Sequence, residues 1–452
     1  MNLQDIPVRV EERSLYEVRE KIYPRAVHGW FAALRWTAVW ATQLVFYGGA
    51  WLTWNDRQAV LFDIVHRKFY LFGLVFWPQD VVYLTVLLIL AALSLFLFTA
   101  VAGRIWCGYA CPQTVYTELF MWIERVIEGD RNARIRLDKL PAGKRLPRKV
   151  AKHAVWIAVA LWTGFTFVGY VTPIRELWAE VLALSTGPWE TFWIAFYAFA
   201  TYGNAGWMRE QVCKYMCPYA RFQSAMFDKD TLIITYDAKR GEPRGKGKGV
   251  GDCVDCGICV QVCPTGIDIR HGLQYECIGC AACVDGCEQV MDKLARPRGL
   301  IRYSTTHALE GRATRIVRPR VLVYSAILLA IGAAMLASLY LRVPLKLDVI
   351  RDRAAIAREV EGGLIENVYR LQVMNTAEQA RAFELSVSGL PGLQLWGDPT
   401  IGVGAATSRV VPVKLRLPAD AAKPGSHRIE FHLRALGVEG IEVDEHSVFI
   451  VQ

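Results

Sequence analysis

Histidine is scarce in this sequence, and the long apolar stretches contain almost none. The chain of 452 residues has only eight histidines, and His153 is the one that lies near such a stretch, at its edge. A b-type haem inside a membrane takes its axial ligands from the helices, usually from histidines, so we expect no such haem here. The sequence also lacks a C-x2-C-H run, which excludes a covalently attached c-type haem.

Several other motifs are missing. The glycine-rich segment 237–251 contains no G-x4-G-K-[ST] motif, so it does not predict a nucleotide site. Residues 1–29 are polar and basic and lack the apolar core and cleavage site of a signal peptide, so we expect none. The net charge is +9, but most aromatic residues lie in apolar runs and are not interleaved with basic ones. Nucleic acid is therefore not a predicted partner.

Cysteine, in contrast, has a clear pattern. Eight of the 12 cysteines form two runs, Cys253-x2-Cys256-x2-Cys259-x3-Cys263 and Cys277-x2-Cys280-x2-Cys283-x3-Cys287. Three cysteines at this spacing hold three corners of an iron-sulfur cube, and the fourth cysteine of each run ligates the other cube. The pattern predicts two [4Fe-4S] clusters, one held by Cys253, Cys256, Cys259 and Cys287 and one held by Cys263, Cys277, Cys280 and Cys283.

Zinc and disulfides are the alternative interpretations of these two runs. Structural zinc sites use two separated pairs of ligands instead of a triplet, and disulfides need an oxidising compartment. Pro264 follows the first run, whereas Glu288 stands at the same place after the second. Proline is not a ligand, so this difference affects the local turn and not the predicted cluster.

The composition predicts a membrane protein with soluble parts. Hydrophobic residues make up 53% of the chain, and its mean hydropathy is +0.22. About 20 apolar residues in a helix are needed to cross about 30 Å of hydrocarbon, and five stretches meet this requirement: 30–54, 81–102, 153–172, 189–207 and 321–341. The fourth stretch contains Glu190, Tyr197 and Asn204, so we expect it to pack inside a helical bundle.

Lysine and arginine predict the orientation of these spans. Ten of them lie between residues 125 and 152, after the second stretch, whereas the preceding loop has only Arg57, Arg67 and Lys68. By the positive-inside rule, the N-terminus and the cysteine-rich loop face the cytoplasm of a bacterial inner membrane, and the C-terminal part is periplasmic. A reducing cytoplasm also suits labile clusters. In the first outside loop, residues 59–77 are predicted to form either an interfacial segment or a hairpin.

The other four cysteines form a repeated motif. Cys107-x3-Cys111-Pro112 follows the second stretch and Cys213-x3-Cys217-Pro218 follows the fourth, each shortly after an arginine, Arg104 or Arg209. Cysteines at i and i+4 lie on one face of a helical turn, and the proline disfavours helix at the second cysteine. Four such sulfurs suit a copper ion in the monovalent state, another cofactor or a redox-active dithiol. The alternative is that they are buried packing residues.

The remaining segments complete the predicted domain order. Residues 113–128 have apolar side chains at helical spacing and predict either a helix on the inner membrane surface or an ordinary packed helix. Segments 237–252 and 296–320 are basic and predict flexible linkers. From about residue 345, apolar and polar residues alternate in about seven runs, which predicts an immunoglobulin-like sandwich. The sandwich has no cysteine and so no disulfide.

The predicted architecture is therefore an α-helical membrane bundle with an inserted bacterial-type ferredoxin domain and a C-terminal all-β immunoglobulin-like sandwich. Its parts are a cytoplasmic segment (1–29), a four-span membrane domain (30–236), a linker (237–252), the ferredoxin domain (253–295), a second linker (296–320), a fifth span (321–341) and the periplasmic sandwich (345–452). This order, with both C-x3-C-P motifs, resembles the FixG/CcoG/RdxA family, accessory proteins for assembly of cbb3-type cytochrome c oxidases. The C-x3-C-P pairs alone are also similar to those of NapH-type and NosR-type membrane proteins.

The resemblance implies a cupric reductase. Such a protein would reduce Cu(II) to Cu(I) in the cytoplasm for the copper chaperones or transporters that supply the oxidase. By motif match, the copper-facing thiols would be Cys107, Cys111, Cys213 and Cys217, and the eight ferredoxin cysteines would be the electron relay. The electron donor is open, as is the oligomeric state, with a homodimer as one option. A quinol dehydrogenase, with a pocket near Trp106, Tyr109 and Tyr202, and a non-catalytic assembly scaffold are the alternative functions.

Overall fold

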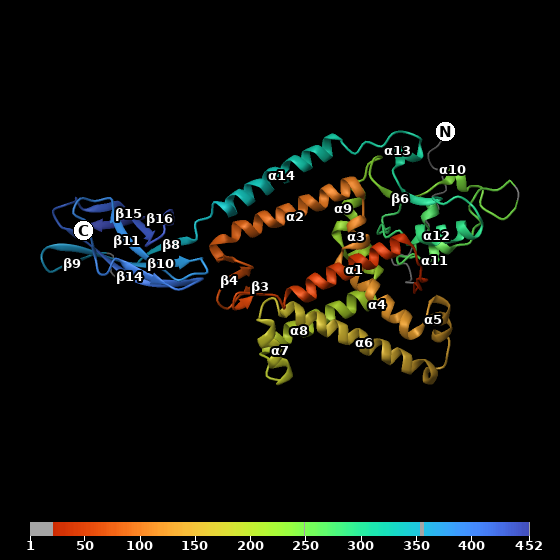
Figure 1. Ribbon diagram of the computed structural model, residues 1–452, viewed down its shortest axis with the longest axis horizontal. Helices are drawn as coiled ribbons and strands as arrows, with labels where there is room; N and C mark the ends of the chain where they lie inside the picture. The colour runs from red at the N-terminus through yellow and green to blue at the C-terminus, as the bar shows by residue number, and fades with distance from the viewer. Residues whose placement is uncertain (1–20, 248, 353–356, 452) are drawn as a thin grey trace, which may run out of the picture. The chain divides into compact units, whose positions relative to one another are not determined.

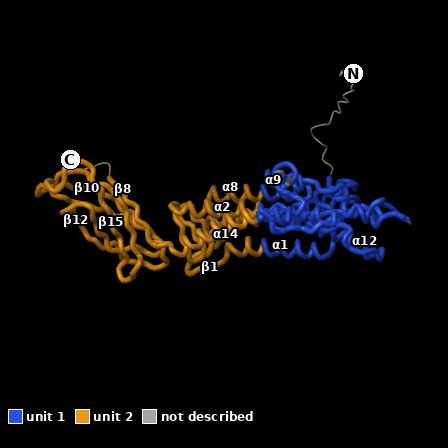
Figure 2. The backbone as a smooth tube through the Cα atoms, turned by 90° about the horizontal axis from the view of Figure 1, so that it is seen from above, with its two compact units in different colours: residues 1–42, 97–160, 199–321 blue, residues 43–96, 161–198, 322–452 orange. Residues whose placement is uncertain are grey.

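The computed structural model describes residues 21–247, 249–352 and 357–451. The basic residues Arg9, Arg13 and Arg19 of the predicted cytoplasmic segment lie outside the described residues. The chain divides into two compact units, each built from three segments (Figure 2). Unit 1 consists of residues 1–42, 97–160 and 199–321, and unit 2 consists of residues 43–96, 161–198 and 322–452. All 12 cysteines belong to unit 1.

Each of the five predicted membrane stretches contains a helix (Figure 1). These helices are α1 (Trp30–Gly49), α2 (Val81–Ala102), α6 (Ala142–Val168), α8 (Pro188–Thr201) and α14 (Pro319–Tyr340). Three segments of the described chain are long and apolar enough to cross a membrane: 78–102, 142–168 and 319–340. The other two fall short, because polar residues such as Arg35 and Gln43 lower the mean hydropathy of α1 and α8 has only 14 residues.

The basic stretch before the third predicted span is helical and not a loop. Helix α6 begins at Ala142, so Lys144, Lys149 and Lys152 lie in its first three turns. Before it come α3 (Ile105–Tyr109), α4 (Pro112–Glu128) and α5 (Arg131–Asp138). Helix α4 covers the predicted segment 113–128. Its apolar residues lie in two environments, since Val115 and Ile123 are buried in the protein whereas Trp122 and Val126 are exposed.

The ferredoxin region is enclosed by a two-stranded antiparallel sheet. Strand β6 (Ile233–Tyr236) pairs with β7 (Ile301–Ser304), and between them lie α10 (Ala238–Gly241), α11 (Ile258–Gln261), the 3-10 helix η4 (Ile269–His271) and α12 (Ala282–Lys293). Helix α13 (Thr306–Leu309) follows β7. The two predicted linkers therefore contain regular structure. In the first, the Asp252 amide donates to the Arg240 carbonyl, and in the second, β7 completes the sheet.

In unit 2, the predicted outside loop forms short antiparallel strands. A first pair comprises β1 (Thr53–Trp54) and β2 (Arg57–Gln58), and the strands β3 (Val60–Asp63), β4 (Lys68–Leu71) and β5 (Leu74–Phe76) make a second sheet, so the hairpin alternative is confirmed. The 3-10 helix η1 (Pro78–Asp80) leads into α2, and α7 (Ile174–Leu182) follows α6. Helices α2 and α14 lie side by side (Figure 1), with the Tyr83 hydroxyl 2.8 Å from Ser338 Oγ.

The C-terminal part of unit 2 is the predicted sandwich, with nine strands among the described residues. The strands are β8 (Leu345–Arg351), β9 (Arg358–Val360), β10 (Leu364–Asn375), β11 (Arg381–Ser388), β12 (Gln394–Trp396), β13 (Thr400–Val403), β14 (Thr407–Pro418), β15 (Gly425–Ala435) and β16 (Glu442–Val451). One sheet has the order β12-β14-β10-β8 with β9 beside β10, and the other has the order β13-β11-β15-β16. Fully buried Tyr369, Phe383, Phe431 and Phe449 fill the core between them.

Candidate metal centres

The eight ferredoxin cysteines line two cavities in the predicted groups. One cavity is lined by Cys253, Cys256, Cys259 and Cys287, and another by Cys263, Cys277, Cys280 and Cys283, with Cys259 also among its lining residues. The fourth cysteine of each run thus lines the cavity of the other run. These donor sets fit cubane clusters, which would be held by the thiolates and would supply one-electron transfer.

Backbone conformation explains how such short runs surround a cavity. Gly257 has φ +64° just before α11, and Ala281 has φ +57° just before α12, so the chain turns sharply at both places. The turns direct backbone amides toward sulfur: the Gly279 amide lies against Cys277 and the Ala282 amide against Cys280. Burial raises the pKa of Cys277 to about 12, so thiolate at this place depends on a metal that replaces the proton.

The two C-x3-C-P motifs end in the same way, although their first cysteines lie in different kinds of helix. Cys107 lies in α3 and Cys111 is the residue that precedes α4; Cys213 lies in the π-helix η3 (Val212–Met216) and Cys217 precedes α9 (Pro218–Met226). In each motif the second cysteine is extended, with ψ of 128° at Cys111 and 109° at Cys217. The proline then occupies the first helical position, where its missing N–H is not needed. The predicted break at the second cysteine is present in both motifs.

The four thiols of these motifs come together in unit 1, and we call them the four-thiol site. The Cys213 thiol lies within electrostatic range of Cys107, Cys111 and Cys217, and burial, followed by these neighbours, raises its pKa to about 12. The pKa of Cys107 rises to about 11 for the same reasons. All four side chains are partly buried. The buried guanidinium of Arg104 lies within electrostatic range of three of the thiols and of Cys277.

The four-thiol site contacts the second ferredoxin run directly. A Cβ atom placed on Gly108 would lie 2.7 Å from the Gly279 carbonyl oxygen and 3.0 Å from the Cys280 Cα. Arg104 donates a hydrogen bond of 3.1 Å to the Cys277 carbonyl. No side chain therefore separates Gly108, between Cys107 and Cys111, from the loop that holds Cys277 and Cys280, and the two sets of thiols are adjacent.

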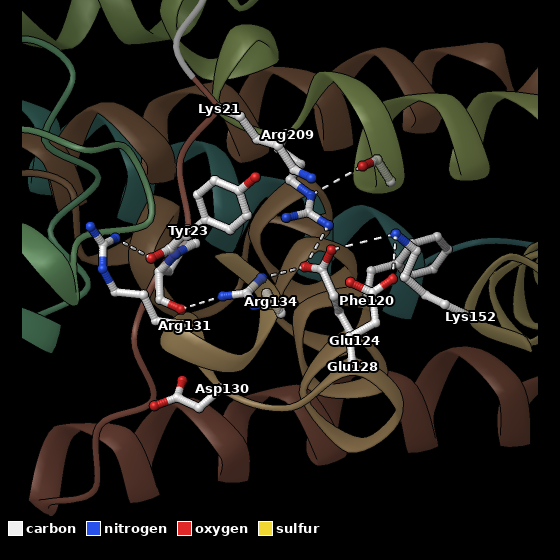
Figure 3. Close-up of polar contacts among 12 residues, drawn as sticks. Lys21, Tyr23, Phe120, Glu124, Glu128, Asp130, Arg131, Arg134, Lys152 and Arg209 are labelled. Atoms are coloured by element: carbon white, nitrogen blue, oxygen red, sulfur yellow. Dashed lines mark hydrogen bonds and ion pairs between the residues drawn. The ribbon is translucent and has the colours of Figure 1, made fainter. Parts of the chain in front are cut away.

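A buried ion network holds the second motif against the helix of the first (Figure 3). Glu124, in α4, lies between three cations: Arg134 at 2.6 Å, Arg209 at 3.0 Å and Lys152 at 3.6 Å. Its side chain is 3% exposed. Burial by itself would raise the pKa of Glu124, but the charges of Arg209, Arg134 and Lys152 outweigh this and lower it. The carboxylate is therefore ionised and fixes Arg209, four residues before Cys213.

Gln113 provides a second link between the motifs. Its Nε2 donates to the carbonyls of Asn204 at 3.0 Å and Arg209 at 3.1 Å, in and just after the π-helix η2 (Tyr202–Met208). Arg209 has φ +41°, which is unusual for a residue with a side chain. Two π-helical turns on either side of a strained residue are typical of functional segments. Here they bring Cys213 and Cys217 to the start of α4.

A cavity of about 750 Å³ opens beside both sets of thiols. Cys213 and Cys280 contribute to its lining together with five arginines and two glutamates: Arg25, Arg35, Arg125, Arg134, Arg209, Glu118 and Glu210. The lining is therefore positively charged on balance. Such a cavity favours anionic ligands over free cations.

Sequence reasoning identified part of this arrangement. It singled out both motifs and the arginines ahead of them, and the structure places Arg104 at the thiols and Arg209 in the Glu124 network. It missed Glu124 and Gln113, for which only the helical pattern of segment 113–128 gave a signal. The residues considered for a quinone pocket have separate partners, since the Tyr109 hydroxyl lies 3.3 Å from Tyr303 and the Tyr202 hydroxyl 3.0 Å from His153.

Comparisons with known proteins agree with the iron-sulfur assignment. A family model described as "4Fe-4S dicluster domain" matches residues 208–306, and one described as "4Fe-4S binding domain" matches residues 84–128. A third, described as "IG-like fold at C-terminal of FixG", matches residues 335–452. The iron-sulfur domains and the C-terminal sandwich are thus both recognised from the sequence as well as from the fold.

The matches to whole proteins extend over most of the chain. "Nitrogen fixation protein FixG" of Rhizobium meliloti is 39% identical over 89% of this chain and 87% of its own length. "Protein RdxA" of Cereibacter sphaeroides is 40% identical over 90% of each chain. The crystal structure of a FixG-related protein from Vibrio parahaemolyticus is 28% identical, with a TM-score of 0.23, over 24% of this chain and 97% of that one. The chain belongs to the FixG/RdxA family of iron-sulfur electron-transfer proteins.

Proposed function

We propose that this protein reduces Cu(II) to Cu(I) in the cytoplasm for assembly of a cbb3-type cytochrome c oxidase. The observation that supports this most is the contact between Gly108 of the four-thiol site and Gly279 of the second ferredoxin run. Electrons held by iron-sulfur clusters at the ferredoxin cysteines would have a short route to the four-thiol site and from there to copper. Sulfur ligands favour Cu(I) over Cu(II), and iron-sulfur centres reach potentials low enough to reduce copper, within a range of about −700 to +450 mV.

The reaction transfers one electron to each copper ion. A reductant of low potential, which in the cell is an unidentified donor, loads the iron-sulfur centres, and Cu(II) then leaves as Cu(I). Released Cu(I) would pass to copper chaperones or transporters and so to the oxidase assembly machinery. After the external reductant is removed, the protein should reduce about as many copper ions as it has one-electron centres.

The membrane topology is part of the proposal. Five spans, with the N-terminus and the ferredoxin domain in the cytoplasm of a bacterial inner membrane and the sandwich in the periplasm, would give the clusters a reducing compartment. The ten cations between residues 125 and 152 support this orientation. A homodimer is compatible with the proposal and is not needed for it.

Anaerobic copper reduction by the purified protein tests the proposal. We expect dithionite-reduced protein, freed of reductant, to form Cu(I) on addition of Cu(II), with matching loss of the reduced-cluster signal. The variant Cys280→Ser should form much less Cu(I), whereas Glu430→Gln, on the sandwich, should match the wild type. Cluster oxidation without Cu(I) formation, or Cu(I) formation at the same rate in Cys280→Ser, would contradict the assignment.

The arginine-lined cavity predicts which copper species reacts best. Five arginines against two glutamates repel a free divalent cation and attract an anionic chelate. We expect a Cu(II) citrate complex to be reduced several-fold faster than a cationic amine complex of similar potential. The difference should shrink as salt is raised, because ions screen the field of the cavity. Equal rates with both complexes at low salt would show that copper does not approach through this cavity.

A quinol-oxidising relay is the second candidate, and one observation favours it. An open cavity is lined by His153, Trp156 and Trp207, which offer planar surfaces, and by charged side chains that include Lys149, Lys152 and Glu210, which offer hydrogen-bonding groups. Arg209 and Glu210 line this cavity and also the one beside Cys213. If this candidate is right, a reduced quinone analogue will reduce the clusters anaerobically without dithionite.

A further inference from the structure

The chain contains three groups of four cysteines with the same relation among their thiols. Cys287 is within electrostatic range of Cys253, Cys256 and Cys259, and Cys283 is within range of Cys263, Cys277 and Cys280. Cys213 has the same relation to Cys107, Cys111 and Cys217. Among the described residues, no three histidine, cysteine or acidic side chains converge closely enough to hold a single metal ion. The four-thiol site therefore groups its four thiols as the two ferredoxin sets do.

The surroundings of the four-thiol site are those of an anionic, sulfur-rich group. The Gln223 side chain is fully buried, and its amide contacts both the Cys107 thiol, at 3.5 Å, and the Tyr219 hydroxyl. The Nε of buried Arg104 is without an acceptor. The amides of Gln113 and Thr114, in the first turn of α4, lie against the Cys111 sulfur. These donors match the N–H to sulfur hydrogen bonds that surround iron-sulfur clusters.

The cysteine counts of the two matched segments are complementary. Residues 84–128 match a 4Fe-4S binding model but contain only two cysteines, Cys107 and Cys111. Residues 208–306 match a dicluster model, yet they contain ten cysteines where two clusters need eight, and the extra two are Cys213 and Cys217. The fold brings the two cysteines of the first segment and the extra two of the second together, which completes a set of four ligands.

We propose that Cys107, Cys111, Cys213 and Cys217 together hold a third [4Fe-4S] cluster. Each C-x3-C-P motif contributes two ligands, and the buried cation of Arg104 balances part of the negative charge of a thiolate-ligated cluster. This inference deepens the proposed electron-transfer function, because the third cluster would be the centre between the second ferredoxin run and the electron acceptor. It does not depend on copper being that acceptor.

Metal and sulfide analysis of the full-length protein tests the inference. Anaerobically purified and reconstituted protein should contain about 12 iron and 12 sulfide per chain, against about 8 of each for two clusters. The double variant Cys213→Ser/Cys217→Ser should lose about one third of the iron and keep the paramagnetic signals of the two ferredoxin clusters. Gly143→Ala, whose added Cβ meets nothing within 4 Å, is the matched control and should keep about 12.

Two further results separate a ligand role from misfolding. Cys107→Ser/Cys111→Ser should lose the same third of the iron, and the quadruple variant should lose no more than either pair, because all four residues serve one cluster. A wild-type count of about 8 iron, or iron content unchanged in both double variants, would overturn the inference. Iron is counted without copper present, so a protein with about 12 iron that does not reduce Cu(II) would refute the proposed function and leave the third cluster standing.

Discussion

Gly108 decides how closely the four-thiol site approaches the second ferredoxin run. The atoms that an added Cβ would meet, at 2.7 Å and 2.9 Å, are the backbone oxygen and carbon of Gly279, which have little freedom to move. We expect Gly108→Ala to destabilise the protein by about 1–3 kcal/mol, as overpacking does. Electron transfer to Cu(II) should slow because the two sets of thiols are pushed apart. Thermal unfolding and stopped-flow reduction measure the two effects.

Gly143→Ala, in α6, is the control for this substitution. Nothing lies within 4 Å of its added Cβ, and alanine is the better helix former, so the midpoint of unfolding should stay the same or rise slightly. If Gly108→Ala behaves like Gly143→Ala in both measurements, the contact with Gly279 does not matter for function.

Glu124 is the second residue whose role depends on its surroundings. Removing its charge leaves Arg134, Arg209 and Lys152 buried without their common anion. Loss of one partner of a buried ion pair costs about 3–5 kcal/mol, so we expect Glu124→Gln to lower the free energy of unfolding by that order. Glu310→Gln, in an exposed pair with Arg312, should cost less than about 1 kcal/mol. Denaturant unfolding compares the two variants.

The pKa of Glu124 also predicts a pH dependence. Its pKa lies below the ordinary value of 4.5 in the folded protein, so the folded state holds the carboxylate more strongly than the unfolded state does. The stabilisation is complete above pH 4.5 and is lost as the pH falls through the lower folded-state pKa. The difference in free energy of unfolding between wild type and Glu124→Gln should therefore shrink under acid conditions. A constant difference down to pH 2 would contradict this assignment of charge.

At the scale of single residues, cysteine spacing predicted which cysteines share a cavity, because a cluster fixes that spacing chemically. Glu124 and Gly108 were not predicted, because their roles depend on which distant segments meet. The sequence predicts that a glutamate on an amphipathic helix is solvated, whereas in the structure three cations from other segments surround Glu124. Likewise, the need for glycine at position 108 follows from the backbone of Gly279, which the sequence does not place beside it.

At the scale of elements, the strands around the ferredoxin region were missed. Strands β6 and β7 have four residues each, which is too short for an alternating pattern to appear, and the basic glycine-rich sequence between β6 and the first run predicted a flexible linker. The π-helices η2 and η3 were missed for a different reason. No local sequence pattern distinguishes a π-helical turn from an α-helical one, and Gln113 and Glu124, which contact Arg209 between the two π-helices, are distant in the sequence.

Strand β6 should shield a cluster if it is part of the ferredoxin fold. Ile234 is 3% exposed and lines the cavity with Cys277 and Cys280. We expect Ile234→Ala to cost about 2–5 kcal/mol, as buried isoleucine truncations do, and to admit solvent and oxygen to the cavity. Visible absorbance in air should therefore bleach several-fold faster than in wild type. Ile316 is exposed, so Ile316→Ala is the control and should bleach at the wild-type rate. Equal bleaching rates in the two variants would show that β6 does not shield the cluster.

At the scale of the whole molecule, the sandwich was predicted because its long strands alternate strictly. In β15, for example, Ile429, Phe431 and Leu433 are buried, whereas His432 is half-buried and Arg434 is exposed. The pattern predicted about seven strands and the described residues form nine, since β9 and β12 have only three residues each, too few for alternation to identify a strand. The number of membrane spans was predicted less well than the sandwich. The sequence predicts five spans, whereas only three helices of the described residues are long and apolar enough to cross a membrane.

The two topologies place the same loops on opposite sides, so the question has a sharp test. Five spans with the N-terminus inside put residues 55–56 and 185–187 in the periplasm and residues 140–143 in the cytoplasm. Three spans, 78–102, 142–168 and 319–340, reverse all three positions while leaving the C-terminus outside. Fusions at the C-terminus cannot distinguish these cases, whereas short epitopes inserted at the three loops can.

We expect antibody added to intact spheroplasts to label epitopes at 55–56 and 185–187 and not at 140–143. The physical reason is the cost of moving Lys144, Arg145, Arg148 and Lys149, at the start of α6, away from the cytoplasm. An epitope inserted into the sandwich at the Gly437–Gly440 turn should be labelled in every case and controls for access. Permeabilised cells should then label the epitope at 140–143. Labelling of 140–143 in intact spheroplasts would contradict the five-span arrangement, and it would also contradict the contact between Gly108 and Gly279, because three spans place these two residues on opposite sides of the membrane.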